Sequence, residues 1–451
     1  MIWNEIRELT RLGLPMVGTQ FFIMAMGFLD TAMAGHYASV DLAGVALGGN
    51  ILWPVFMLLA GLTMALTPMV AHFRGEGKVH QLGGLVRQGI WLALFSSAII
   101  IAIITHAGPV FDFFEIDPTA SDIADRYLKA AAWGIPGVMA YVTLRYVCEG
   151  LGHTVEPMLI AGSSLLINGT LNYILIYGKL GFPEMGGEGC GWATAITMWC
   201  ELVLMLFLIS RPWFRETGLL SRFEWLHFDN LLSIIKVGLP IGLTSFIGMA
   251  VFSVVAFFIG SIGVTALAAH SIAGNINWAT FVIPMSLGSA ASIRVGYFVG
   301  AGDFAYARQV SKTAFQISLV YALFTSILLI SGRHLITAIY SNDLIVLEVA
   351  SSLLIIVAIY QIVDCTQATM IGSLRGYKDT RVPMVYSLIG YWIFALPIGA
   401  VLGFGYISEP WGVYGFWTGM ALGLFFVCML VGRRLYQTSH DDERIRAFAA
   451  I

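Results

Sequence analysis

The stretch GLPMVGTQFFIMAMGFLDTAMAGHY, residues 13–37, is a run of apolar and small residues that contains one acidic side chain, Asp30. Such a run is long enough for a helix to cross a hydrocarbon core about 30 Å thick. The stretch therefore predicts a membrane-spanning helix with a carboxylate inside it. Ionisable groups in that position are costly and usually mark a functional site.

Similar runs recur along the chain, which has 451 residues, 58% of them hydrophobic and 11% charged. A soluble domain carries about 25% charged residues. Runs of this length favour helices over the short alternating strands of a membrane barrel. We expect an all-α integral membrane protein whose twelve transmembrane helices lie at about 10–34, 44–72, 87–107, 127–147, 157–178, 189–210, 236–260, 267–299, 313–331, 347–371, 383–404 and 412–432.

An internal repeat divides the chain into two halves. GLPMVGTQFF at 13–22 resembles GLPIGLTSFI at 238–247, and the same offset of 225 residues aligns GGNI at 48–51 with AGNI at 273–276. Six helices are an even number, so both halves cross the membrane in the same sense. Two such pseudo-symmetric bundles around a central cleft form the architecture of alternating-access transporters.

The repeat also sets the domain boundaries. We expect an N-terminal six-helix lobe over 1–210, a polar and basic cytoplasmic linker over 211–234, and a C-terminal six-helix lobe over 235–451. Because each chain would then contain both lobes and the cleft, we expect a monomer.

Positive charge predicts the orientation. Of the 24 Lys and Arg residues, 20 fall in segments on the side of the two termini, and 4 fall on the other side. The side rich in Lys and Arg is the cytoplasmic one. We therefore expect both termini in the cytoplasm. The first residues lack the features of a cleavable signal peptide, so the first helix should remain in the membrane.

Several chemistries are not indicated by the sequence. It shows no GxxxxGK[ST] phosphate loop, no metal-ligand cluster, and no nucleophile–base pair, and its five cysteines form no CxxC pair. We expect neither an enzyme nor a bound cofactor, and no nucleic-acid partner; the partners expected are small amphipathic molecules and membrane lipid.

Asp30 is the first candidate for an ion-coupling residue. It lies about 27 Å along the first span at 1.5 Å per residue. An interfacial aspartate at a helix end is the alternative, but apolar and small residues continue as far as Gly35. A carboxylate held away from water can bind a proton under physiological conditions, as a proton-coupled carrier requires.

Oxygen-bearing residues in the fifth and sixth spans are further candidates. Asn168 and Asn172 are four residues apart and share a helical face, and Thr194 opens the sixth span. Asparagines also join helices by hydrogen bonds alone. Together with Asp30, the three residues provide the hard oxygen ligands that Na⁺ favours.

The tenth span presents a similar group, Tyr360, Asp364 and Gln367, whose spacing allows all three to share a face. An internal hydrogen-bond network between helices is the alternative. Glu201 lies in the middle of the sixth span, where it either faces the cleft or pairs with a positive group that the sequence does not identify. Arg145 and Glu149 lie near the cytoplasmic end of their span, where helix-end pairing explains them.

These residues occur in stretches that resemble the multidrug and toxic compound extrusion (MATE) family. MGFLDTAMAG, NGTLNYILIYG, GCGWATA, IRVGYFVGAG and GSLRGYKDTRVP appear in this order over nearly the whole chain. The likeness is greatest to the bacterial sodium- or proton-coupled branch. It implies an antiporter in the bacterial inner membrane: H⁺ or Na⁺ enters down its gradient while amphipathic, often cationic, drugs leave.

The resemblance also implies roles for particular residues. Asp30 matches the cation-site aspartate of the N-terminal lobe, and Asn168, Asn172 and Thr194 match its polar neighbours. Asp364, with Tyr360 beside it, matches the acid of the C-terminal lobe. Many members of this branch carry a glutamate in the seventh span where this chain has Gly248. This departure moves the weight of ion coupling from Asp364 to Asp30.

Two other functions stay open. A flippase of lipid-linked precursors would line its cleft with Arg or Lys, whereas this chain holds nearly all of them in cytoplasmic segments or at span ends. A passive channel would conduct without stoichiometric countertransport, and a receptor would normally carry a soluble output domain. The sequence does not decide between proton and sodium coupling.

Overall fold

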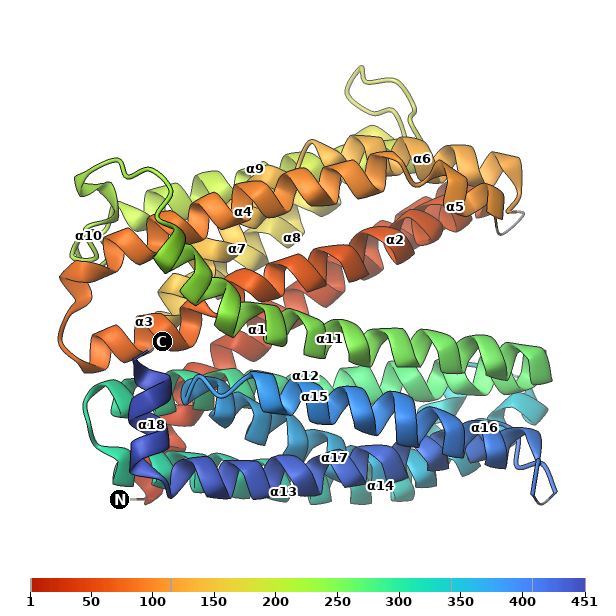
Figure 1. The fold of residues 1–451 in the computed structure, drawn as a ribbon. Helices are drawn as coiled ribbons and strands as arrows, with labels where there is room; N and C mark the ends of the chain where they lie inside the picture. The colour runs from red at the N-terminus through yellow and green to blue at the C-terminus, as the bar shows by residue number, and fades with distance from the viewer. Residues whose placement is uncertain (1, 114–115, 342, 408, 451) are drawn as a thin grey trace. The chain divides into compact units, whose positions relative to one another are not determined.

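The computed structural model describes residues 2–113, 116–341, 343–407 and 409–450, and the regular elements in these ranges are helical (Figure 1). Helices are expected where a chain meets lipid, because every backbone N–H and C=O must then be paired within the segment. The prediction of an all-α fold is confirmed.

The helices of the first half begin and end close to the predicted spans. They are α1 (Ile2–Tyr37), α2 (Ser39–Met64), α3 (Leu66–Gly75), η1 (Val79–Gln81), α4 (Leu82–Thr105), α5 (Gly108–Phe113), α6 (Pro118–Ala132), α7 (Ile135–Gly150), α8 (Val155–Ile176), α9 (Gly187–Ile209), α10 (Pro212–Arg215) and η2 (Leu219–Ser221).

The second half has fewer and longer helices. They are α11 (Phe228–Ile262), α12 (Val264–Gly300), α13 (Phe304–Ala338), α14 (Leu344–Gly376), α15 (Arg381–Leu388), the π-helical η3 (Ile389–Ala395), α16 (Leu396–Phe404), α17 (Val413–Ser439) and α18 (Asp442–Ala449).

Within the described ranges, eleven helical segments are long and apolar enough to cross a membrane. The region predicted as the fourth span, 127–147, differs from the others. It consists of the end of α6 and most of α7, which are separated by a turn at Trp133 and Gly134. Pro136 follows this turn, and a proline near the start of a helix is compatible with it because its missing N–H needs no partner there.

The described chain separates into two compact units, which do not follow chain order at their edges. One comprises Leu14–Gly242, and the other comprises Met1–Gly13 with Leu243–Ile451. We call them the N-terminal and C-terminal units. α1 and α11 each pass from one unit to the other, beside Pro15 and Pro240 respectively. These prolines lie 225 residues apart, so the repeat places the crossing at matching positions.

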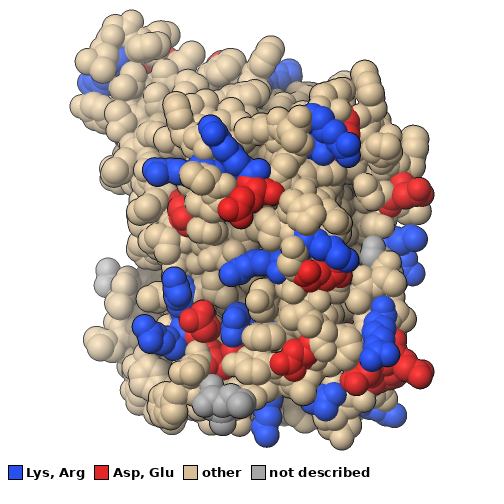
Figure 2. Space-filling model, turned by 90° about the vertical axis from the view of Figure 1, so that its left-hand side faces the viewer, with Lys and Arg blue, Asp and Glu red and all other residues tan. Residues whose placement is uncertain are grey.

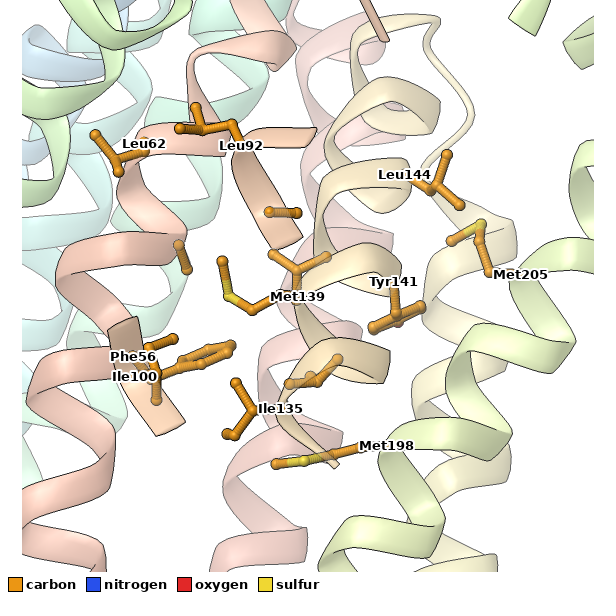
Figure 3. Packing of buried hydrophobic residues seen from close by; sticks show 14 of the residues in the cluster. Phe56, Leu62, Leu92, Ile100, Ile135, Met139, Tyr141, Leu144, Met198 and Met205 are labelled. Carbon is orange, nitrogen blue, oxygen red and sulfur yellow. The ribbon is translucent and has the colours of Figure 1, made fainter. Parts of the chain in front are cut away.

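In the N-terminal unit, α9 packs against α8, α6 and α7, and α2 packs against α6 and α4. Figure 3 shows the apolar side chains between these helices, among them Phe56, Met139, Tyr141 and Met198. α11 approaches α2 very closely: a Cβ on Gly61 would lie 2.3 Å from the Cα of Gly242. Small residues at helix crossings allow such approach in membranes.

The C-terminal unit is built around α14, which packs against α12, α13 and α17. α12 and α14 cross where a Cβ on Gly372 would lie 2.2 Å from the carbonyl oxygen of Gly288. The first turns of α1 are held to α12 by Arg294, which donates to both carboxylate oxygens of Glu5 at 2.9 and 2.6 Å.

Lys and Arg side chains lie among Asp and Glu side chains on the face shown in Figure 2. An arginine of α4 holds the segment between the halves against that helix. Arg87 donates to Glu224 and to the carbonyl oxygens of Gly218 and Leu219. The hydrogen bonds from Arg87 hold the pKa of the Glu224 carboxyl below its usual range. This segment therefore belongs structurally to the N-terminal unit.

Candidate ion-coupling site

Asp30 lies on α1, seven residues before the end of the helix, and only 7% of it is exposed. Asn172 on α8 donates through Nδ2 to Asp30 Oδ1 at 2.6 Å, and the hydroxyl of Thr194 on α9 donates to Asp30 Oδ2 at 3.4 Å. Three helices thus bring together residues that are more than 140 positions apart. The short bond to Asn172 is the stronger of the two.

Asn168 extends this group by one helical turn. Asn172 Nδ2 also donates to Asn168 Oδ1 at 3.0 Å, and both asparagines are fully buried. Asn172 Oδ1 and Asn168 Nδ2 have no hydrogen-bond partner among the described residues. An amide offers a donor or an acceptor depending on its rotation. Asn172 is therefore able to donate to a charged Asp30 or to accept from a protonated one.

Two neighbours of Asp30 were not predicted from the sequence. Cys190, one turn before Thr194 on α9, lies within hydrogen-bonding reach of the carboxylate. The ring of Tyr127, on α6, lies close enough to interact with its charge. Both are buried. The four-residue spacing of Cys190 and Thr194 placed them on one face of α9, but the apolar surroundings of Cys190 gave no reason to select it.

The donor set of this site suits a proton or a hard monovalent cation. It offers a single carboxylate with amide and hydroxyl oxygens, and sodium favours oxygen ligands of this kind. Within the described ranges, no group of three or more His, Cys, Asp or Glu side chains could hold a metal ion. The ligands of zinc and other transition metals are thus not assembled in the described part of the chain.

Asp364 on α14 is the corresponding acid of the C-terminal unit, and it too is 7% exposed. Its polar neighbour is Asn277 on α12, with which it interacts by hydrogen bonding. Tyr360, one turn earlier, and Tyr391 in η3 lie near the carboxylate. Gln367 is buried one turn further along α14. Asn277 was missed because its surroundings, AGNINW, indicate no more than an apolar span.

Tyr360, which lies near the C-terminal acid, belongs to a cluster of aromatic rings. The ring of Tyr360 meets those of Phe252 and Trp417 edge-on, with centroids 6.3 and 5.5 Å apart. Trp417 also donates to His270 at 3.1 Å. The polar groups near Asp364 are thus an amide and two phenols, whereas those near Asp30 are amides and an aliphatic hydroxyl.

Glu201 lies on α9, 5% exposed, seven residues beyond Thr194. Its neighbours are Ser164 on α8 and Arg145 on α7. Arg145 is the positive group that the sequence did not identify, and it also donates to Glu149 at 2.8 Å. Glu201 therefore belongs to a second buried group in the N-terminal unit.

Comparison with known proteins gives consistent results. A family model named MatE matches residues 15–174 and 240–401. The multidrug resistance protein MdtK of Edwardsiella ictaluri is 39% identical over 436 residues, which cover 96% of this chain and 95% of that protein. The multidrug resistance protein PmpM of Pseudomonas aeruginosa is 38% identical, with 98% and 94% covered.

Solved structures share the fold. The eukaryotic MATE transporter AtDTX14 superposes with a TM-score of 0.90 at 19% identity, over 100% of this chain and 99% of that one. The Vibrio cholerae MATE transporter VcmN in its bent form gives 0.85 at 18% identity, over 98% and 99%.

Proposed function

The chain belongs to the MATE family of membrane transporters, so it is not an enzyme, and we propose that it exports amphipathic, often cationic, drugs in exchange for H⁺ or Na⁺. The names of its relatives support multidrug export, and Asp30 with its polar neighbours supports the coupling to a cation. The observation that carries the proposal is the 2.6 Å hydrogen bond from Asn172 to this buried carboxylate.

The proposed cycle starts when Asp30 binds a proton or Na⁺ from outside the cell. Neutralising the carboxylate weakens the hydrogen bonds that it accepts from Asn172 and Thr194, so these bonds rearrange. Pro15 removes a backbone hydrogen bond from α1 and makes bending cheap there. The rearranged helix disfavours the drug-bound state, and the drug leaves. Coupling requires that cation and drug stabilise different conformations, as in alternating access.

The setting of this function is also a proposal. The positive charge of the loops and the bacterial relatives support a place in the bacterial inner membrane with both termini in the cytoplasm. Lobes at 1–210 and 235–451, joined by the linker 211–234, would act as a monomer. The proposal needs no cofactor besides the coupling ion.

The test uses the full chain in proteoliposomes loaded with tetraphenylphosphonium, an amphipathic cation. A Na⁺ gradient is imposed first and a pH gradient second, and export is followed with an electrode selective for the probe. We expect one of the two gradients to drive export, and we expect Asp30→Asn to abolish it. Equal rates for Asp30→Asn and the unmodified chain at equal protein amounts would refute the role of Asp30.

The same vesicles separate the proposal from a passive channel. A channel releases the probe down its own gradient and cannot accumulate it against one, because no second flux supplies free energy. We expect uphill movement of the probe with a fixed number of cations per probe molecule. Release that stops at equal concentrations would favour the channel.

A further inference from the structure

Glu201 is a buried carboxylate that the proposed cycle does not use. Two residues of α7 lie near it: Arg145, and Tyr141, which also interacts with Glu149. Arg145 and Glu149 already neutralise each other through their 2.8 Å hydrogen bond. An ionised Glu201 would therefore leave a net negative charge in a dry interior, which is costly unless the group takes up a proton.

A second observation points to a ligand at this place. The hydroxyl of Tyr141 is buried and has no hydrogen-bond partner among the described residues, although Tyr141 is close enough to interact with Glu201, Arg145 and Glu149. A buried polar atom left unpaired calls for an explanation such as a functional role or a bound ion. A sodium ion suits this place less well, because the guanidinium of Arg145 would repel it.

A row of polar side chains on α8 runs from the neighbourhood of one carboxylate to that of the other. Ser164, Asn168 and Asn172 are spaced by four residues, which puts them on one face with about 6 Å of rise per step. Asn172 contacts Asp30, and Ser164 contacts Glu201. All three are fully buried. On the other side of Glu201, Arg145 and Glu149 lie one turn apart on α7, close to the end of that helix at Gly150.

We propose that Glu201 is a second proton-binding site, and that Ser164, Asn168 and Asn172 form a route by which a proton passes between it and Asp30. The proton leaves Asp30 as that group becomes a carboxylate, and Glu201 becomes a neutral acid before it releases the proton toward Arg145 and Glu149. This inference rests on the proposed function and requires that the coupling ion is H⁺.

The test compares two modes of transport in the same proteoliposomes. In the first, a pH gradient drives export of tetraphenylphosphonium. In the second, labelled probe exchanges with unlabelled probe at equal pH on both sides. Glu201→Gln should slow gradient-driven export about tenfold while exchange stays within about twofold, because only the first mode needs proton transit. Glu201→Asp should restore export, and Ser164→Ala should show a smaller loss of the same kind.

Two matched control variants distinguish a loss of proton transit from a general structural effect of substitution. Glu188→Gln changes an acid in the first turn of the same helix, and Ser97→Ala removes a buried hydroxyl that, like that of Ser164, bonds a carbonyl four residues earlier. Both should behave as the unmodified chain.

Three outcomes overturn the inference. Wild-type export by Glu201→Gln at every pH, or equal loss of export and exchange, refutes the proton route and leaves the proposed function standing. Export driven only by Na⁺ in the unmodified chain also refutes the route. If neither gradient drives export, the proposed function itself fails.

Discussion

Asp30 in the N-terminal unit and Asp364 in the C-terminal unit are buried in long helices to the same extent, yet the two acids have different surroundings. Asp30 accepts hydrogen bonds from Asn172 and Thr194 on two other helices, whereas Asp364 interacts with Asn277 and lies near Tyr360 and Tyr391. The repeat offset of 225 residues places Val255 opposite Asp30, and Leu52 opposite Asn277. The two halves thus share the helical scaffold but do not carry their candidate acids at matching positions.

This difference leads us to propose different tasks for the two units. The N-terminal unit has donors that can stabilise a charged carboxylate and amides that can serve a neutral one. The C-terminal unit surrounds its acid with Asn277, Tyr360 and Tyr391, and Gly248 stands where the resemblance described above implies a glutamate. We infer that coupling depends mainly on Asp30.

The largest expected effect comes from removing each acid in turn. Asp30→Asn should reduce gradient-driven export by about tenfold or more, because the group that links cation and substrate is lost. Asp364→Asn should leave a greater part of the activity. Initial export rates from proteoliposomes at equal protein content measure both, and a reversed order would contradict the comparison.

The second prediction concerns Asn172, whose bond to Asp30 is the shortest at the site. Asn172→Leu keeps the branched shape of the side chain and removes both the donor and the oxygen. With proton coupling, losing a donor to the charged form favours the protonated form, so half-maximal export should occur at higher pH. With sodium coupling, losing an oxygen ligand should raise the Na⁺ concentration needed. The Thr194 hydroxyl lies further from Asp30, at 3.4 Å. Thr194→Val should therefore cause a smaller shift in the pH of half-maximal export, or in the Na⁺ concentration needed.

The third prediction concerns scaffold glycines. A side chain on Gly372 would collide with the backbone of Gly288, so Gly372→Leu should cost about 1–3 kcal/mol of stability, as overpacking does. A Cβ on Gly248 meets no described atom within 4 Å. Gly248→Ala should therefore leave the unfolding temperature in detergent nearly unchanged. Equal destabilisation by both variants would contradict the packing described for α12 and α14.

The smallest effect is expected from restoring the missing acid. Because the space around Gly248 is open, Gly248→Glu should fold and insert normally. If the absence of this acid is what weakens the C-terminal site, Asp364→Asn should reduce export further in the Gly248→Glu background than in the unmodified chain. Initial export rates of the four chains measure this, and identical losses in both backgrounds would show that Gly248 is not the reason for the difference.

The sequence predicted the helical class, the repeat and the group around Asp30, because apolar length, a constant offset and helical spacing are local properties. Other features depend on contacts between distant positions. Asn277 reaches Asp364 from a span that reads as apolar, and the pairing of Glu5 with Arg294 joins the first turns of α1 to a helix 289 residues away. The turn at Trp133 and Gly134 was hidden within a continuous apolar run.

The motif LRGYKDT also makes contacts with distant residues that its sequence does not predict. Its aspartate, Asp379, is buried and accepts hydrogen bonds from Arg434 at 2.5 Å and from Thr438 at 2.8 Å, both on α17. The motif contributes to the resemblance to the MATE family. Its contacts show that Asp379 links the end of α14 to the end of α17. A short motif does not reveal its partner when the partner lies 55 residues further along the chain.

The most direct measurement is the competition between cation and probe for the purified full-length chain. Binding of tetraphenylphosphonium is titrated while the proton or Na⁺ concentration is varied. The account predicts that rising cation concentration weakens binding to the unmodified chain and to Asp364→Asn, and that binding to Asp30→Asn no longer responds. Unchanged competition in Asp30→Asn would contradict the account, because linkage would then arise at another site.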